Sequence, residues 1–150
     1  MMRAAVASFL RFALGAALLI GVALNFANIT GRYVFGTPII WAEEALIYLL
    51  VWCVFLGAPL VSLEGQQIRI DLLVDHLSAT PRRVCDAFVA LLSLAVCAFV
   101  AVQAWHVTAA MLRMNQRSIA ADVPMALPHA AILVGFVGMA IAIVLRWRAR

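Results

Sequence analysis

Charged and apolar residues are sharply separated along this chain. Four stretches of 19 to 26 residues contain no Asp, Glu, Lys or Arg: 12–31, 45–63, 87–112 and 123–145. About 20 apolar residues are needed to cross a hydrocarbon core of about 30 Å, and backbone polar groups in lipid must be satisfied within the segment itself. The pattern therefore predicts an all-α protein, an integral membrane four-helix bundle of up-and-down topology.

Prolines and threonines indicate where the helices begin. Thr37-Pro38 and Thr80-Pro81 each place a hydroxyl N-cap before a proline in the first helical position, and Pro128 marks a similar start. The whole chain then forms one transmembrane domain, residues 1–150, with helices predicted at about 9–31, 38–63, 81–112 and 128–146. Pro59 lies inside the second helix and removes a backbone hydrogen bond, so we expect a kink there.

The longest predicted connection, residues 64–80, has a helical pattern of its own. Its apolar residues recur at i, i+3, i+4 and i+7: Ile70, Leu73, Val74 and Leu77. Asp71 points away from this stripe, as expected for a helix with one polar face. We therefore predict a short amphipathic helix on the membrane surface between the second and third helices.

Composition and charge exclude several classes of protein. The chain is 67% hydrophobic and 12% charged, with a mean hydropathy of +1.07, which excludes a soluble monomer. The net charge of +4 comes from eleven Arg at the predicted helix ends, so it indicates membrane orientation and no nucleic-acid partner. With both termini in the cytoplasm, eight of these Arg lie on the inner side, which is the arrangement we expect. We also expect the first stretch to be a membrane helix and not a cleaved signal.

No ionisable side chain lies near the middle of any predicted helix. Proton relays and ion sites in membranes usually depend on such residues, so we expect no complete transport pathway here, although a homo-oligomer could line a small pore. The sequence contains no G-x-S-x-G, Walker loop, H-E-x-x-H or dinucleotide-binding motif, and the three cysteines form no C-x-x-C pair. We therefore predict that the chain is not an enzyme and holds no metal or cofactor. His106 and His129, at the outer ends of two helices, leave a bis-His haem as an alternative.

Small and polar residues recur along one side of three predicted helices. The three stripes are Ala17, Gly21, Asn25, Asn28 and Arg32; Ala90, Ser93, Cys97, Ala101 and Ala104; and Ala131, Gly135, Gly138 and Ala142. Small residues let helices approach closely in lipid, and Asn can form hydrogen bonds across the contact. Packing within the bundle and docking of a separate membrane subunit are both compatible with these stripes.

Charged residues near the start of the second helix allow two interpretations. Glu43 and Glu44 lie where the helix dipole favours negative charge, and Arg32 is on the same side of the membrane. The pair can orient the first two helices locally, or it can contact charged groups of a partner. Tyr33 and Trp41 fall at the outer interface, where aromatic rings anchor helices.

Several ordered motifs resemble the small membrane subunit, of the DctQ type, of tripartite ATP-independent periplasmic (TRAP) transporters. An Asn before an Arg-Tyr-Phe cluster, then Pro and Trp-x-Glu-Glu, then Trp-x-x-Phe-Leu-Gly and Ile-Arg-Ile-Asp are typical of that family. The matching residues include Asn28, Arg32, Tyr33, Pro38, Trp41, Glu43, Glu44, Trp52, Gly57, Arg69 and Asp71. The chain departs from the family at Gln67, where a His is usual.

The resemblance implies a partner interface or structural role for these residues. It also implies a multi-pass protein of the bacterial inner membrane that scaffolds a large permease subunit. In such a system an ion gradient (Na⁺) drives uptake of an organic acid, which a periplasmic solute-binding protein delivers. Two other classes remain as alternatives: a b-type haem membrane anchor of an electron-transfer enzyme, and a small oligomeric exporter.

Overall fold

The computed structural model describes residues 2–64 and 79–148. These residues form four long helices: α1 (Met2–Tyr33), α2 (Ala42–Glu64), α3 (Ala79–Arg113) and α4 (Ala126–Trp147). The described residues include no β-strand. Each is long and apolar enough to cross a membrane. The predicted all-α membrane class with four helices is therefore confirmed.

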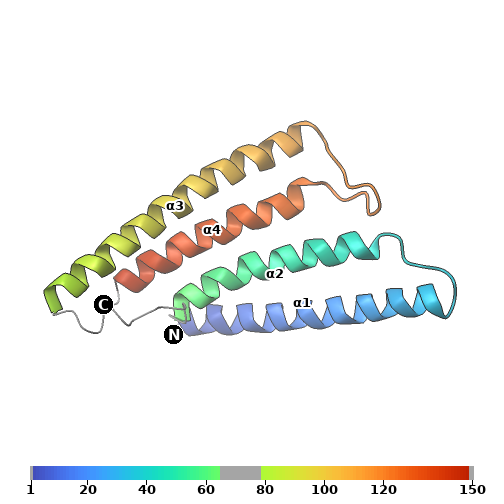
Figure 1. The fold of residues 1–150 in the computed structure, drawn as a ribbon, viewed down its shortest axis with the longest axis horizontal. Coiled ribbons are helices and arrows are strands. Elements are labelled where there is room, and N and C mark those ends of the chain that lie inside the picture. Colours follow the sequence, from blue (N-terminus) through green and yellow to red (C-terminus); the bar gives the residue numbers. More distant parts are fainter. Residues whose placement is uncertain (1, 65–78, 149–150) are drawn as a thin grey trace.

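The four helices lie side by side in a single layer, in the order α1, α2, α4, α3 (Figure 1). Within the described residues, α2 packs against α1 and α4, whereas α3 packs only against α4. Successive helices run in opposite directions, as predicted, and both chain termini lie at one end of the layer. We call the opposite end, formed by residues 34–41 and 114–125, the loop end. The chain is thus two helical hairpins joined by the contact between α2 and α4.

Two glycines of α4 make this central contact possible. A Cβ atom built on Gly135 would lie 2.7 Å from the carbonyl oxygen of Phe55 in α2, and one on Gly138 would lie 2.8 Å from Cγ of Pro59. Pro59 has no N–H, so the Phe55 carbonyl lacks its usual donor within α2. Gly135 therefore allows the backbone of α4 to approach the part of α2 where proline has interrupted the hydrogen-bond ladder.

The other predicted stripes also pack largely within the chain. In α1, Gly21 lies against Leu49 of α2, since a Cβ built there would be 2.8 Å from Cδ2 of that leucine. In α3, Cys97 and Ala104 are buried, 5% and 8% exposed. The structure thus shows internal packing for most of the small residues, while Asn25 of the first stripe is exposed.

The predicted start of the second helix at Pro38 is wrong, because α2 begins at Ala42. Thr37 does not cap the helix; its own N–H donates to the carbonyl oxygen of Gly31 at 2.9 Å. The N–H of Ile39 donates to Oδ1 of Asn28, also at 2.9 Å. The chain between α1 and α2 is therefore fixed by contacts to α1, and the helix starts only after them.

The remaining boundaries differ by smaller amounts, except at the N-terminus. α1 begins at Met2 instead of residue 9, and α3 begins at Ala79, two residues before the predicted start. α4 begins at Ala126, after Met125 as an N-cap without a side-chain hydrogen bond, so Pro128 lies within its first turn. The predicted surface helix at 64–80 falls largely outside the described residues, as do Arg69 and Asp71.

Candidate functional site

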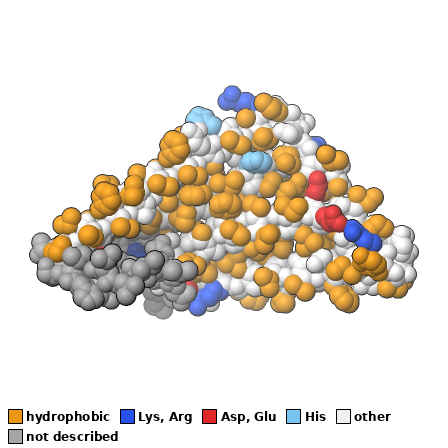
Figure 2. Space-filling view, viewed as in Figure 1, with side chains coloured by type: hydrophobic (Ala, Val, Ile, Leu, Met, Phe, Trp, Pro, Cys, Tyr) orange, Lys and Arg blue, Asp and Glu red, His pale blue; other side chains and the backbone are white. Residues whose placement is uncertain are grey.

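Several networks of polar contacts lie at the loop end, and among the described residues Arg11 and Glu64 form an ion pair towards the opposite end. Figure 2 shows hydrophobic side chains over most of one face, with the few charged ones towards the ends of the helices. Large apolar side chains such as Phe12, Phe26 and Phe99 are 66% to 77% exposed. A surface of this kind is typical of contact with lipid or with another membrane protein.

The first polar network joins α1 to the start of α2. Arg32 Nη2 lies 2.5 Å from Oε1 of Glu43, and both side chains are substantially exposed. Asn28 is buried, 4% exposed, and its carbonyl oxygen holds the Ile39 amide as described above. The turn also needs glycine at position 31, because a Cβ there would lie 2.8 Å from the carbonyl oxygen of Thr37. Asn28, Arg32 and Glu43 together fix how the first hairpin turns.

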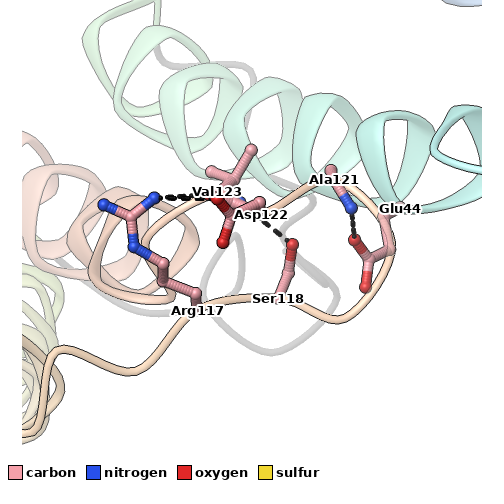
Figure 3. A network of polar contacts seen from close by, with 6 residues as sticks. All are labelled: Glu44, Arg117, Ser118, Ala121, Asp122 and Val123. Atoms are coloured by element: carbon pink, nitrogen blue, oxygen red, sulfur yellow. Dashed lines mark hydrogen bonds and ion pairs between the residues drawn. The ribbon is translucent and has the colours of Figure 1, made fainter.

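The second network joins α2 to the α3–α4 connection (Figure 3). Glu44 Oε2 accepts hydrogen bonds from the backbone N–H groups of Ala121 at 2.8 Å and Ala120 at 3.3 Å. Within the connection, Arg117 Nη1 lies 3.1 Å from Oδ2 of Asp122. The carboxylate of Glu44 thereby attaches the beginning of α2 to a loop 76 to 77 residues further along the chain.

A third set of contacts closes the same loop on itself. The N–H of Ser118 donates to the carbonyl oxygen of Val123 at 2.9 Å, and the Val123 N–H donates to Oγ of Ser118 at 3.2 Å. Asp122 adopts a left-handed conformation (φ 51°), which Asp tolerates better than most residues. The loop that receives Glu44 is therefore a built turn with its own hydrogen bonds.

Glu43 and Glu44 thus have separate partners although they are neighbours in sequence. Glu43 pairs with α1 and Glu44 with the α3–α4 connection. The local ion pair between Arg32 and Glu43, one of the two interpretations of the sequence, is present. The residues that receive Glu44, from 117 to 123, were missed by the sequence reasoning. No local pattern marks that contact, because its two sides are so far apart along the chain.

Aromatic residues just before and within α2 line an open groove beside this loop. Trp41, Tyr48 and Trp52 lie along one side of the start of α2 and face Ala121 and Val123 across a space of about 630 Å³. The Tyr48 hydroxyl donates to Sδ of Met125 at 3.4 Å. Trp41 and Trp52, both predicted site residues, are therefore brought together with the receiving loop.

The other predicted site residues lie apart from these networks. Tyr33 is 81% exposed at the end of α1, and Pro38 is exposed in the connection. Gly57 lies further along α2, where a Cβ would meet Cδ1 of Leu14 in α1 at 3.9 Å. The sequence motif therefore combines residues of the loop end with one residue of the α1–α2 packing contact.

The two histidines of the predicted haem alternative, His106 and His129, have different surroundings. Nδ1 of His129 lies 2.7 Å from the carbonyl oxygen of Met125, and His106 is exposed. Within residues 2–64 and 79–148, no group of three or more His, Cys, Asp or Glu side chains could hold a metal ion.

Comparison with known proteins shows the family. Residues 21–150 match the model of the DctQ component of tripartite ATP-independent periplasmic transporters. A putative TRAP transporter small permease protein of Haemophilus influenzae is 28% identical over 121 residues, 80% of this chain and 74% of that protein. The C4-dicarboxylate TRAP transporter small permease protein DctQ of Vibrio cholerae is 33% identical over 60 residues, 40% of this chain but only 26% of its own length. This chain therefore belongs to the DctQ family of small TRAP transporter permease subunits.

Proposed function

We propose that this chain is a scaffold that holds a large permease subunit in the bacterial inner membrane. The large subunit carries the substrate and Na⁺ sites, and the substrate is an organic acid delivered by a periplasmic solute-binding protein. The observation that carries the proposal is the arrangement of the helices. In the described residues they form a single layer and surround no central space. A row of helices supports a neighbour along its face but does not enclose a transport pathway.

The distribution of charge supports the same proposal. Among the described helices, charged side chains lie near the ends, for example Arg11, Glu43 and Arg146, and the central turns carry none. Membrane transport sites usually need ionisable side chains or broken helices near the midplane. The charges and ion sites of transport are therefore assigned to the large subunit.

The orientation of the chain follows from its arginines. With both termini in the cytoplasm, the positive-inside rule is satisfied, and the loop end faces the periplasm. Residues 32–44 and 113–128 then form part of the surface that the solute-binding protein meets. The hydrogen bonds from Ala120 and Ala121 to Glu44 hold these two segments next to each other.

Co-purification tests this function. The tagged chain, co-expressed with the large subunit of its transporter, is expected to retain that subunit through detergent extraction and size-exclusion chromatography. The purified material is expected to show no Soret band. Recovery of the chain alone in every mild detergent, or as a haem-containing complex, would overturn the proposal and favour the exporter or the haem anchor.

A further inference from the structure

A second groove runs between α3 and α4, in the half of the layer nearer the chain termini (Figure 1). We call it the α3–α4 groove. Its space of about 530 Å³ falls within the range of about 300 to 1,000 Å³ that is typical of ligand sites. Most of its lining side chains are apolar and come from both helices, including Val89, Leu92, Val96, Met139 and Ile143. The groove therefore suits an apolar ligand.

Two charged side chains of opposite sign also line the α3–α4 groove. Asp86 lies near the start of α3, and Arg146 lies in the last turn of α4. The start of α3 and the end of α4 are at the same end of the layer. A ligand of this groove therefore meets apolar side chains along most of its length and both a positive and a negative charge at one end.

Arg146 is half-buried and carries an uncompensated charge. In the described part of the chain, no hydrogen bond or ion pair involves its guanidinium, whereas Arg11, at the same end of the layer, is paired with Glu64. Trp147 also lines the groove and is 48% exposed. Because tryptophan is enriched at the level of the lipid head groups, Arg146 lies where phosphate groups of the bilayer are close. A phosphate is an anion that an arginine binds well.

The α3–α4 groove has about the length of one leaflet of a bilayer. Its lining residues on α3 and on α4 fall within residues 86–97 and 136–147, so each set extends over eleven steps of 1.5 Å, or about 16 Å. Half of a hydrocarbon core of about 30 Å is about 15 Å. A lipid with its head group between Asp86 and Arg146 would therefore reach the middle of the membrane with its acyl chain.

We propose that the α3–α4 groove binds phosphatidylethanolamine, with one acyl chain along its apolar side chains, the phosphate on Arg146 and the ammonium group on Asp86. Basic pockets between membrane helices bind lipid head groups in this way, and a carboxylate accepts hydrogen bonds from an ammonium group. Asp86 takes part in another interaction within the protein, but a carboxylate has acceptor sites for more than one partner. The proposal requires only that the chain lies in a membrane, so it does not depend on the scaffold function.

Photocrosslinking tests the proposal with the full chain in vesicles that contain equal amounts of phosphatidylethanolamine and phosphatidylglycerol. A photoactivatable residue is placed at Leu92, which lines the groove, or at Leu91, which is 70% exposed and is not among the lining residues. Mass spectrometry identifies the lipid attached at each position. At Leu92 we expect about five times more phosphatidylethanolamine than phosphatidylglycerol, the effect of one favourable charge near the membrane surface. At Leu91 we expect no such excess.

Substitutions of the charged residues test which part of the lipid each one binds. Arg146→Gln is expected to lower the amount of lipid attached at Leu92 about fivefold. Arg148→Gln is the matched control, because Arg148 is exposed at the same helix end and does not line the groove. Asp86→Asn is expected to leave lipid attached but to abolish the excess of phosphatidylethanolamine. Thermal melting of each variant shows whether the fold is retained.

Three results would overturn the proposal. The first is the same ratio of the two lipids at Leu92 and Leu91, and the second is an unchanged amount of attached lipid in Arg146→Gln. The third is a crosslink from Leu92 to residues 65–78 of this chain or, in cells, to another protein, because a polypeptide would then occupy the groove. If Asp86→Asn does not fold, the comparison of Leu92 with Leu91 and of Arg146→Gln with Arg148→Gln still decides.

Discussion

Replacing Gly135 with leucine is expected to destabilise the isolated chain by about 3 kcal/mol, because the new side chain meets backbone. Any Cβ at this position would lie 2.7 Å from the carbonyl oxygen of Phe55 and 2.8 Å from its Cβ. These atoms belong to a helix and cannot turn aside as the end of a flexible side chain can. The α2–α4 contact would have to open, and in the described structure it is the contact between helices that joins the two hairpins.

Thermal unfolding of the purified chain in detergent measures this effect. Gly15→Leu is the matched control, since Gly15 also lies in a spanning helix and a Cβ there meets no atom within 4 Å. The control is expected to melt within about 2 °C of the wild type, because replacing an exposed helical glycine removes no contact. Equal melting temperatures for Gly135→Leu and Gly15→Leu would contradict the packing described for α4.

Reversing the charge at Arg32 is expected to impair assembly and uptake far more than stability. Arg32→Glu places two carboxylates where an ion pair stood, at the point where α1 turns towards α2. An exposed pair contributes only about 0 to 1 kcal/mol to folding, so the isolated chain should still fold. The altered hairpin would present a changed loop end to its partners, and we expect uptake by the complex to fall about tenfold, which corresponds to about 1.4 kcal/mol.

The double variant Arg32→Glu with Glu43→Arg provides the control for this prediction. It restores an ion pair with the charges exchanged, so it should recover much of the lost assembly. Uptake in proteoliposomes and co-purification with the large subunit are the two measurements. Wild-type assembly and uptake in Arg32→Glu alone would show that the pair does not shape the hairpin for its partners. Reversed membrane orientation is not expected, because the change removes a positive charge from the outer side.

The four helices could be predicted from sequence because each charge-free stretch is long enough to span a membrane. The start of α2 could not, since the Ile39 amide is held by Asn28, eleven residues earlier. The local capping pattern of Thr37-Pro38 predicts a helix that begins there, because this pattern does not include contacts with α1. The start of α2 therefore depends on a tertiary contact that a local capping rule does not include.

The candidate site was predictable to a similar extent. The pairing of Arg32 with Glu43 was one of two readings, because both lie at the same predicted end of adjacent helices. The partner of Glu44 could not be predicted from the sequence, since Ala121 is 77 residues away and contributes only a backbone N–H. The order of the helices in the layer could not be predicted either. Small residues such as Gly135 and Gly138 predict that another helix packs closely against α4, but they do not predict that Phe55 and Pro59 of α2 are their neighbours.

Uptake by reconstituted vesicles tests the central claim, that this chain supports transport but does not perform it. The chain is reconstituted alone, and in parallel with the large subunit and the solute-binding protein, in vesicles with an inward Na⁺ gradient and, outside, a labelled organic acid that the solute-binding protein binds. We expect saturable uptake only in the complete system and none above empty vesicles for the chain alone. Saturable, gradient-dependent uptake by the chain alone would contradict the scaffold function.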